Sequence, residues 1–306
     1  IVIVKGKHLM KQYDCVIIGA GVAGMTAAIY CKRAGISVLL LEKGVPGGQI
    51  NKTSTIENYP GFKQIDGPTL SMNMLDQVQS LEIPYQYGNV TSIEIQGEDK
   101  IIHTDMGDIQ AKRIIVASGR KPRELGLPNE KALVGGGVSY CAYCDGMLYK
   151  DQDVAIVGGG NSALEEALYL ANICKNVYLI HRREEYRADQ ILVDKIKKYD
   201  NIKPCLNQEV IEILEQDNKV CGVRLKDQSV LNVTGIFIYV GQIPETSFIE
   251  NLLTLDHGYI IANEHLETEV EGIYACGDVL KKELYQISTA IGEGALAGTN
   301  VVKSLK

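Results

Sequence analysis

The sequence contains no apolar run of about 18 residues, the length that a helix needs to cross a membrane. The leader from Ile1 to Met10 carries lysine and histidine side chains around Gly6, where a secretory signal would have an apolar stretch and a cleavage site. These absences argue against a membrane-spanning or secreted protein. They predict a soluble, globular chain of the cytoplasm.

A surplus of basic side chains is also absent. Lysine and arginine number 31 against 38 aspartates and glutamates, so the formal net charge is -7. A nucleic-acid scaffold needs a basic surface that neutralises phosphates. The charge balance therefore argues against that class, although it allows a local basic site.

Cysteine is too sparse for a fold stapled by disulfides. Eight cysteines are spread over 306 residues, far below the density of such scaffolds. Six of them stand singly, most within apolar segments, and free cysteine is commonly buried. We predict that these six are reduced core residues: Cys15, Cys31, Cys174, Cys205, Cys221 and Cys276.

The sequence does contain enough apolar material for two domains. Its length and its 45% of apolar side chains can supply two separate cores. Because Met10 directly precedes the first predicted strand, we interpret residues 1–9 as a remnant or a misassigned start and leave them out of the predicted fold.

A nucleotide-binding pattern opens the chain. An apolar strand runs into Gly19-x-Gly21-x-x-Gly24 and an alanine-rich helix, and a second strand, Ser37 to Leu41, ends at Glu42. Glycines allow a tight turn and the close approach of a pyrophosphate to the helix start, and the carboxylate accepts from ribose hydroxyls. The alternative is a purely structural glycine turn. The order of strand, turn, helix, strand and acid favours a dinucleotide site.

The pattern recurs in the middle of the chain. A strand from Asp153 feeds Gly158-Gly159-Gly160-Asn161-Ser162-Ala163, followed by a helical run and the strand Val177 to Ile180. From Gly158 to His181 is 23 residues, the same spacing as from Gly19 to Glu42. The chain therefore contains two dinucleotide units.

The second unit ends in basic residues where the first has its acid. His181-Arg182-Arg183 occupies that position, and Arg187 follows four residues after Arg183. An acid would repel a ribose 2′-phosphate, whereas guanidinium groups bind it. This predicts NADPH as the second nucleotide. The alternative is a solvated charge cluster with Glu184 and Glu185, which the upstream glycines disfavour.

Cys141-Ala142-Tyr143-Cys144 is the one CxxC motif of the sequence. Two thiols at this spacing can form a small disulfide ring, and a helix start stabilises a thiolate, so the pair predicts redox chemistry. Half of a zinc site and an inert buried pair are the alternatives, and no second CxxC or paired-histidine motif completes a zinc site. Asp145 is placed to exchange a proton with the dithiol or to cap a helix.

The first dinucleotide unit is predicted to bind FAD as a prosthetic group. Gly277-Asp278 suits a carboxylate that accepts from the ribityl chain, and the small residues from Gln286 to Gly298 predict a helix packed close to a cofactor. The C-terminal segment thus belongs with the first unit. Crossings between domains are predicted near Ala117-Ser118-Gly119 and near Val240 to Pro244.

The predicted fold class is α/β, with two Rossmann-like three-layer dinucleotide-binding domains, the second inserted in the first. Residues 10–119 and 245–306 form the discontinuous FAD-binding domain, and residues 120–244 form the NADPH-binding domain that carries the CxxC motif.

From Met10 onward the chain resembles the low-molecular-weight thioredoxin reductases, a group of the class II pyridine nucleotide-disulfide oxidoreductases. The motifs that carry the resemblance are Gly19 to Gly24, Gly47-Gly48-Gln49, Glu57-Asn58-Tyr59-Pro60-Gly61, Cys141 to Gly146, Gly158 to Ala163, His181-Arg182-Arg183 with Arg187, and Gly277-Asp278. The resemblance adds further cofactor-binding candidates to those of the two glycine units: Gly48, Gln49, Asn58, Gly119, Asp278, Gln286 and Ile287.

The resemblance implies a homodimer in which NADPH reduces FAD, the flavin reduces the Cys141/Cys144 disulfide, and the dithiol reduces thioredoxin or a thioredoxin-like protein. It implies that Cys144 faces the flavin and that Cys141 attacks the partner disulfide. It also implies a rotation of the NADPH domain between half-reactions, with the two crossing segments as the hinge.

Three positions depart from the family pattern. Tyr285 stands before Gln286 where many members have arginine, which removes that side chain's contact near the flavin. Gly136 replaces a basic residue that helps to dock thioredoxin. The resemblance therefore supports the redox chemistry more strongly than it supports thioredoxin as the partner. Ser118 replaces a frequent threonine and preserves its hydroxyl.

Three other functions compete with this interpretation. A related flavoprotein would pass electrons to a peroxidase-reducing protein, and a ferredoxin-linked reductase of the same architecture would not bind NADPH. A nucleotide-binding redox sensor would have no turnover. Bleaching of the flavin by NADPH separates the sensor from the enzymes.

Overall fold

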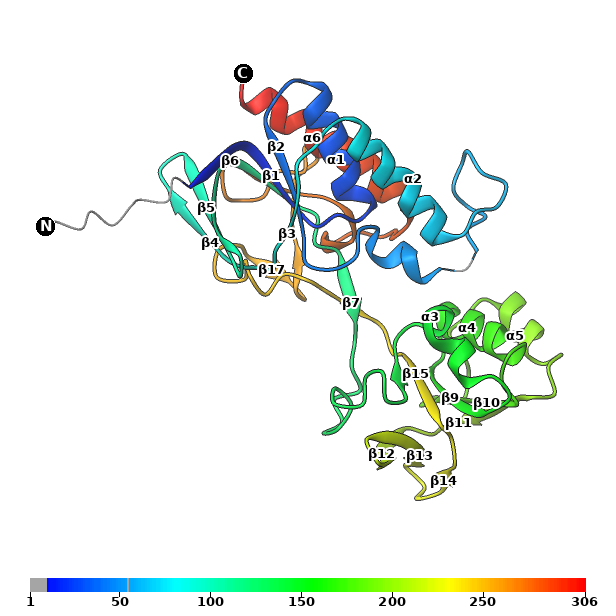
Figure 1. Ribbon diagram of the computed structural model, residues 1–306. Helices are drawn as coiled ribbons and strands as arrows, with labels where there is room; N and C mark the ends of the chain where they lie inside the picture. The colour runs from blue at the N-terminus through cyan, green and yellow to red at the C-terminus, as the bar shows by residue number, and fades with distance from the viewer. Residues whose placement is uncertain (1–9, 54) are drawn as a thin grey trace, which may run out of the picture. The chain divides into compact units, whose positions relative to one another are not determined.

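The computed structural model describes residues 10–53 and 55–306, so the leader of residues 1–9 lies outside the described residues. The chain divides into two compact units (Figure 1). Unit 1 comprises residues 10–121 and Pro244–Lys306, and unit 2 comprises Pro122–Ile243.

Two short strands carry the chain between the units. They are β7 (Arg120–Pro122) and β16 (Gln242–Pro244), and they pair with each other in a two-stranded sheet. The boundaries therefore fall within these strands, two residues after Gly119 at the first crossing and one residue before the predicted end of the inserted domain at the second. The glycine at position 119 predicts where the crossing begins. The boundary between the units is set by the pairing of the two strands.

Unit 1 is built on a seven-stranded sheet in the order β3-β2-β1-β6-β5-β4, with β19 paired to β6. The strands are β1 (Lys11–Ile18), β2 (Val38–Glu42), β3 (Tyr85–Tyr87), β4 (Val90–Gln96), β5 (Asp99–Thr104), β6 (Gly107–Val116) and β19 (Ile273–Ala275). The pairs of β1 with β2 and with β6 are parallel, and the β4–β5 hairpin joins antiparallel. A separate pair is formed by β17 (Leu255–Asp256) and β18 (Tyr259–Ile260).

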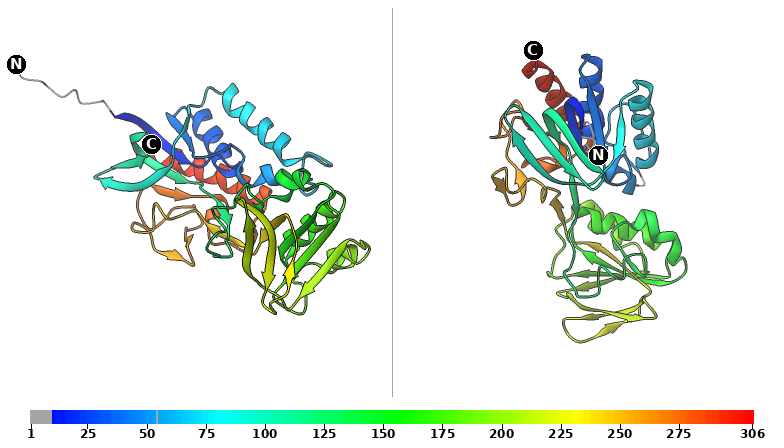
Figure 2. Two further views of the ribbon diagram at one scale, coloured as in Figure 1. Left: turned by 60° about the horizontal axis from the view of Figure 1, so that its bottom comes forward. Right: turned by 60° about the vertical axis from the view of Figure 1, so that its left-hand side comes forward.

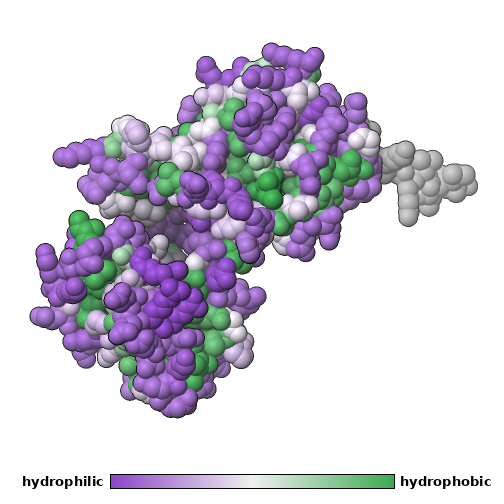
Figure 3. All heavy atoms as spheres, turned by 180° about the vertical axis from the view of Figure 1, so that it is seen from behind, coloured by the Kyte–Doolittle hydropathy of each residue, from purple (hydrophilic) through white to green (hydrophobic). Residues whose placement is uncertain are grey.

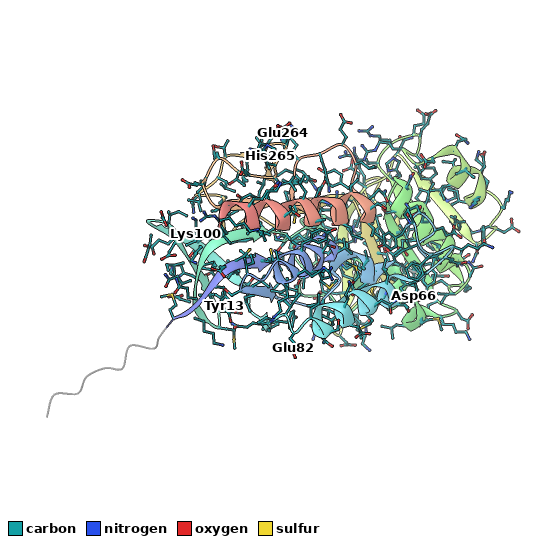
Figure 4. All side chains as sticks on the ribbon, turned by 90° about the horizontal axis from the view of Figure 1, so that it is seen from above. Tyr13, Asp66, Glu82, Lys100, Glu264 and His265 are labelled. Atoms are coloured by element: carbon teal, nitrogen blue, oxygen red, sulfur yellow. A yellow bond between two sulfur atoms is a disulfide. The ribbon has the colours of Figure 1, made fainter. Side chains whose placement is uncertain are left out.

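Helices of unit 1 gather on the sheet with α1 between α2 and α6 (Figure 4). They are α1 (Val22–Arg33), α2 (Gly67–Ser80) and α6 (Ile287–Ser304), and the 3₁₀ turns are η1 (Gly48–Lys52) and η3 (Gly277–Val279). Asp66, labelled in Figure 4, caps α2 by accepting from the N–H of Thr69 at 2.8 Å. A Cβ on Gly294 of α6 would lie 2.3 Å from the oxygen of Ala23 in α1, so small residues let these two helices touch.

Unit 2 has three layers (Figure 2). Its central parallel sheet has the order β11-β10-β9-β15-β8, and a three-stranded antiparallel sheet has the order β12-β13-β14. The strands are β8 (Val138–Ser139), β9 (Asp153–Gly158), β10 (Asn176–His181), β11 (Ile202–Leu206), β12 (Val210–Gln216), β13 (Lys219–Leu225), β14 (Val230–Leu231) and β15 (Gly235–Tyr239). The helices are α3 (Ala142–Asp145), α4 (Asn161–Ala171) and α5 (Gln190–Ile196), with the 3₁₀ turn η2 (Gly146–Tyr149).

Alternation along the central strands of unit 2 produces two cores. Ile156 packs with the helices, while its neighbours Ala155 and Val157 pack with the antiparallel sheet. A parallel strand covered on both faces must be apolar throughout, which explains the unbroken apolar run of β9.

The prediction for the single cysteines was right for four of the six. Four of these cysteines are buried, namely Cys15, Cys31, Cys174 and Cys276. Cys205 is half-buried, and for Cys221 the prediction was wrong, because this thiol is exposed. Cys221 lies on β13, whose outer face has no covering layer, so each second side chain points to solvent.

None of the helices within the described part of the chain is long and apolar enough to cross a membrane. Figure 3 shows one face of the molecule, on which hydrophilic side chains predominate and apolar groups are scattered between them.

Candidate functional site

The turn after β1 has room for glycine alone at two positions. Gly19 has a φ of +106°, and a Cβ on it would lie 2.4 Å from the carbonyl oxygen of Ala117. A Cβ on Gly24 would lie 1.8 Å from the oxygen of Gly19. Gly21, the N-cap of α1, differs, since a Cβ there would meet no atom within 4 Å. The turn is closed toward the sheet and open at Gly21.

The open side of this turn has the donors and acceptors that a dinucleotide needs. No side chain caps α1, so the N–H groups of its first turn face outward with the positive end of the helix. Glu42 lies beside them, because its carboxylate accepts from the N–H groups of Ala20 and Gly44, both at 2.8 Å. Each carboxylate oxygen keeps a lone pair for a ribose hydroxyl. These residues fit the ADP half of FAD.

A second group of predicted residues lies next to Gly21. A Cβ on Gly48 would lie 3.7 Å from the Cα of Gly21. Gln49 follows in η1 and donates from Nε2 to the carbonyl oxygen of Arg120 at 2.6 Å. Gly119, with a φ of +68°, directly precedes that arginine. The fold thus brings the connection after β2 to the start of the first crossing.

The C-terminal candidates complete the arrangement in unit 1. Asn58 donates to Oε1 of Gln286 at 3.0 Å, and Gln286 caps α6 through a reciprocal capping box. Ile287 is the first residue of that helix. Asp278 lies in η3, and a Cβ on the glycine before it would come within 2.8 Å of Ala23 in α1. Two helix starts and one carboxylate therefore converge in unit 1.

The sequence analysis missed two cations of unit 1. Nη2 of Arg120 lies 2.8 Å from Oδ2 of Asp278, and Nζ of Lys282 lies 3.6 Å from Oδ1. The guanidinium carbon lies 4.0 Å from the ring centroid of Tyr285. The spacing of four residues between Asp278 and Lys282, and a basic residue directly after Gly119, were the available signals.

Unit 2 repeats the glycine turn at the end of β9. A Cβ on Gly158 would lie 2.5 Å from the oxygen of Tyr239, whereas one on Gly160 would meet nothing within 4 Å. Gly160 is the N-cap of α4, which has no side-chain cap. Asn161 exchanges two hydrogen bonds with Asp189, at 2.9 and 2.8 Å. The exposed residue Ser162 follows in the first turn, at the open end of the helix.

Three predicted arginines form a basic surface beside this turn. Arg182, Arg183 and Arg187 are exposed, and the backbone N–H of Arg187 donates to the oxygen of Gly159 at 2.7 Å. Within residues 10–53 and 55–306 no ion pair joins them to Glu184, Glu185 or another carboxylate. Their guanidinium groups are therefore open to solvent or to a phosphate, and binding of the 2′-phosphate by these arginines stays a prediction.

His181 is placed differently from the arginines that follow it. Its ring is buried, and a Cβ on Gly159 would lie 2.3 Å from two of its atoms. Burial lowers the pKa of His181, and Nε2 donates to the carbonyl oxygen of Glu185 at 3.1 Å. The ring packs beneath the turn and supports it, and a contact of His181 with the nucleotide stays a prediction.

Cys141 and Cys144 form a disulfide at the start of α3, with their Cα atoms 5.3 Å apart. Cys141 is the N-cap, and its Sγ accepts from the N–H of Cys144 at 3.1 Å. The helix start therefore stabilises negative charge on the sulfur of Cys141 when the bond opens. Among the described residues no group of three or more His, Cys, Asp or Glu side chains could hold a metal ion.

Asp145 is tied to the disulfide through Ser139. The hydroxyl of Ser139 donates to Oδ2 of Asp145 at 2.6 Å and accepts from the N–H of Cys141 at 3.1 Å. Asp145 makes no side-chain cap for the turn that follows it, and it ends α3 instead of starting it. The capping alternative for Asp145 was therefore wrong.

Tyr239 links the disulfide segment to the glycine turn. Its hydroxyl accepts from the N–H of Ala142 at 2.7 Å, and its backbone pairs with Gly158 across β15 and β9. Burial, and secondarily the carboxylate of Glu166, raises the pKa of Tyr239. Because parallel strands end at one edge of their sheet, the disulfide and the turn share the carboxyl edge of unit 2.

Two exposed apolar side chains follow the disulfide in the chain. Cys141 is buried, whereas Cys144 is exposed. Met147 and Leu148 of η2 expose 61% and 69% of their surface directly after the disulfide. Apolar side chains that remain this exposed next to a reactive group favour contact with a protein partner.

Comparisons with known proteins agree on one family. The family description "Pyridine nucleotide-disulphide oxidoreductase" matches residues 13–294. Thioredoxin reductase of Bacillus subtilis is 42% identical over 297 residues, which cover 95% of this chain and 94% of that protein. Thioredoxin reductase of Listeria monocytogenes is 44% identical over 299 residues, which cover 96% and 94%.

Among solved structures, thioredoxin reductase of Lactococcus lactis superimposes with a TM-score of 0.88 and 43% identity, covering 95% of this chain and 98% of its own. This likeness confirms the predicted α/β fold with two Rossmann-like dinucleotide-binding domains.

Proposed function

Since the chain belongs to the pyridine nucleotide-disulphide oxidoreductase family, and within it to the low-molecular-weight thioredoxin reductases, we propose that it uses NADPH to reduce the disulfide of a thioredoxin. FAD is its prosthetic group, and Cys141 with Cys144 is its redox-active disulfide. The observation that carries the proposal is this disulfide at a helix start, on the same sheet edge as a glycine turn bordered by exposed arginines.

Unit 1 supplies the groups that hold FAD. When bound, FAD takes two electrons from NADPH and delivers them to the disulfide. The N–H groups at Gly21 bind the pyrophosphate, Glu42 accepts from the adenosine ribose, and Asp278 accepts from the ribityl chain. The start of α6 at Gln286 and Ile287 adds a second positive helix end.

Unit 2 supplies the groups that bind NADPH. The open glycine side at Gly160 and the first turn of α4 bind the pyrophosphate. Arg182, Arg183 and Arg187 bind the ribose 2′-phosphate, because guanidinium groups form paired, charge-assisted hydrogen bonds with phosphate.

The disulfide chemistry balances within the pair. Two electrons and two protons open the Cys141–Cys144 bond to two thiols. The thiolate of Cys141, stabilised at the helix start, attacks the partner disulfide and displaces one of its sulfurs as a thiolate, which takes up a proton. Cys144 then attacks the mixed disulfide, which restores the Cys141–Cys144 bond and releases the reduced partner. Asp145, the acid that directly follows Cys144, exchanges the protons of the dithiol, and Ser139 holds its carboxylate in place.

In this proposal Cys144 receives electrons on the flavin side, and Cys141 becomes accessible to the partner when unit 2 rotates. Cys141 is buried, so its attack requires such a change. Two features support a hinge at the crossings: Gly119 and Gly241 have φ of +68° and +115°, and two short strands alone carry the chain between the units. The Ser118 hydroxyl, which donates to the oxygen of Glu245 at 2.6 Å, ties the two crossings together on the unit 1 side.

We also propose a homodimer. The helices of unit 1 carry large exposed apolar side chains, namely Tyr30 of α1, Met72 of α2 and Leu296 of α6. Such side chains on neighbouring helices are typical of an interface. Sedimentation equilibrium of the purified protein measures the assembly, and a monomer at micromolar concentration would contradict it.

A cytoplasmic location is part of the proposal. The six cysteines outside the CxxC motif are free thiols, which a reducing compartment preserves. Cell fractionation measures this, and recovery in an oxidising compartment would contradict it.

The deciding experiment is an anaerobic titration of the yellow protein with NADPH, followed by oxidised thioredoxin. NADPH should bleach the flavin absorbance, and thioredoxin should restore it. If NADPH bleaches the flavin and a peroxidase-reducing protein, but not thioredoxin, restores its absorbance, thioredoxin is the wrong partner and the peroxidase-reducing protein is the right one. If reduced ferredoxin bleaches the flavin and NADPH does not, ferredoxin is the electron donor. If neither bleaches it, the protein is a sensor.

A further inference from the structure

Arg120 is held from three sides at the point where the chain leaves unit 1. Its Cζ lies 4.0 Å from the ring centroid of Tyr285, and its Nη2 lies 2.8 Å from Oδ2 of Asp278. Its carbonyl oxygen accepts from Nε2 of Gln49 at 2.6 Å. The side chain is 19% exposed. A long, flexible cation fixed in this way is part of a built arrangement, because each contact restricts its rotamers.

The carboxylate of Asp278 is clamped between two cations. Oδ2 faces Arg120, and Oδ1 lies 3.6 Å from Nζ of Lys282. Lys282 also pairs with Glu293 at 2.8 Å, and the same Glu293 oxygen accepts from the N–H of Gly277 at 2.8 Å. Lys282 therefore shares its charge between two carboxylates. Arg120 makes no second ion pair within the described part of the chain, so Asp278 does not share it with another carboxylate.

Arg120 also has an unused donor. Its Nε is buried and has no hydrogen-bond partner among the described residues. A guanidinium offers five N–H donors, and a buried donor without a partner costs free energy. The unused donor lies on the side chain that orients the carboxylate assigned to the ribityl chain.

We propose that Arg120 is a positioning residue of the flavin site, which fixes the carboxylate of Asp278 for the ribityl hydroxyls and balances its negative charge beside the flavin. The inference rests on the proposed function, since it requires that unit 1 binds FAD. Tyr285 contributes by stacking on the guanidinium. The ring is itself held, because its hydroxyl donates to the oxygen of Leu280 at 3.3 Å.

Orientation and charge have separable consequences. Loss of the Arg120 charge leaves Asp278 without its own counter-ion, so the site becomes more negative. Two-electron reduction adds negative charge to the flavin, so a more negative site lowers its midpoint potential. Loss of the Tyr285 ring removes the orientation of the guanidinium and keeps its charge, so FAD affinity falls while the potential changes little.

The test compares R120M, R120K and Y285L with R113M. Arg113 serves as the matched control, since it is an arginine of unit 1 that donates to Ser304 at the other end of α6. FAD affinity is measured by the flavin fluorescence of the apoprotein titrated with FAD, and the midpoint potential by equilibration with a reference dye.

We expect R120M to weaken FAD affinity about 10- to 100-fold, as for loss of a hydrogen bond between charged groups, and to lower the midpoint potential. R120K should keep the potential and lose part of the affinity, and Y285L should lose affinity alone. R113M should change neither quantity. If R120M does not fold, R120K and Y285L carry the test.

Wild-type affinity and potential in R120M, or wild-type affinity in both R120K and Y285L, would overturn the inference, as would an equal loss in R113M. Neither readout includes thioredoxin. Failure of the protein to reduce thioredoxin would therefore overturn the proposed partner, while unchanged flavin binding in R120M would overturn the role of Arg120.

Discussion

The two sulfurs of the disulfide have different surroundings although they are three residues apart. Cys141 accepts a backbone hydrogen bond at the helix start and is buried, whereas Cys144 is exposed. A sulfur that accepts from an N–H is stabilised as a thiolate. The individual residue, more than the motif, therefore decides which sulfur carries charge after reduction.

Cys144→Ser tests the electron path at this scale. NADPH should still reduce the flavin. Reduction of thioredoxin should be abolished, because the serine hydroxyl cannot form a disulfide with Cys141. Flavin absorbance and thioredoxin-dependent NADPH oxidation are the measurements. Cys221→Ser is the matched control, an exposed free thiol in the same unit, and should behave as the wild type. Turnover with thioredoxin in Cys144→Ser would refute the path.

The choice of NADPH depends on Arg182, Arg183 and Arg187. Replacing them with methionine should raise the KM for NADPH far more than that for NADH, since each charged hydrogen bond to the 2′-phosphate contributes about 1.5 to 3 kcal/mol. Steady-state kinetics with both nucleotides measure this. Arg224→Met, at a half-buried arginine of the same unit that pairs with Glu212, is the control. Equal effects on both nucleotides would remove the basis for NADPH.

At the scale of the element, the start of α1 combines a structural and a ligand-binding role in neighbouring glycines. A Cβ on Gly24 would collide with the backbone of Gly19 at 1.8 Å, whereas one on Gly21 would point into open space. Gly24→Ala should therefore lower the melting temperature of the apoprotein, and Gly21→Ala should leave it unchanged and weaken FAD binding. Calorimetry and FAD titration separate the two. A stable Gly24→Ala apoprotein would contradict the geometry.

Helix α4 carries an acid with an unusual titration. Burial, and secondarily the neighbouring Glu165, raises the pKa of Glu166 from its ordinary value of 4.5 to about 7. The folded state then binds this proton more tightly than the unfolded state, so the contribution of Glu166 to stability is fully present below about pH 4.5 and is lost as the pH rises through 7.

Glu166→Gln should therefore stabilise the protein at pH 8 by up to about 3 kcal/mol and flatten the dependence of stability on pH. Urea unfolding at pH 5 and pH 8 measures the difference. Glu184→Gln, at an exposed acid of the same unit, should leave the pH dependence as it is. If Glu166→Gln kept the wild-type slope, the raised pKa would be wrong.

At the scale of the whole molecule, unit 2 is a continuous insertion whose ends meet. The N–H of Glu245 donates to the oxygen of Gly119 at 3.0 Å, and β7 pairs with β16. Deleting residues 122–243 and joining Lys121 to Pro244 through an Asn-Gly turn should give a folded protein that retains FAD and does not oxidise NADPH. Flavin content and NADPH oxidation are the measurements. A folded but flavin-free product would contradict the assignment of FAD to unit 1.

The cofactor turns were open to prediction because their signal is local. The glycine spacing lies within one turn, although the contacts that require Gly19 and Gly158 are with Ala117 and Tyr239, far away in the chain. Gly24 is required by its contact with Gly19 in the same turn, and the position of Glu42 follows from the strand that it ends. The same holds for the CxxC pair, whose spacing brings the sulfurs together within one helical turn.

Contacts between segments far apart in the chain were not open to prediction. Arg120 reaches Asp278 across 158 positions, and Tyr239 reaches Ala142 across 97. Gly136 is explained in the same way, because a Cβ there would lie 2.6 Å from the oxygen of Asn218, a residue of the β12–β13 turn. No spacing rule connects such pairs.

By itself, the sequence determined two dinucleotide turns, a redox disulfide, the basic end of the second unit and the insertion of one domain in another. The turns, the disulfide and the basic end depend on residues within one strand, turn and helix, where backbone geometry links neighbours directly, and the insertion follows from the order of these motifs along the chain. Only the tertiary structure decided that His181 is buried, that Cys221 is exposed, and that Arg120 faces Asp278. Those properties arise from the packing of sheets and helices, which no local pattern encodes.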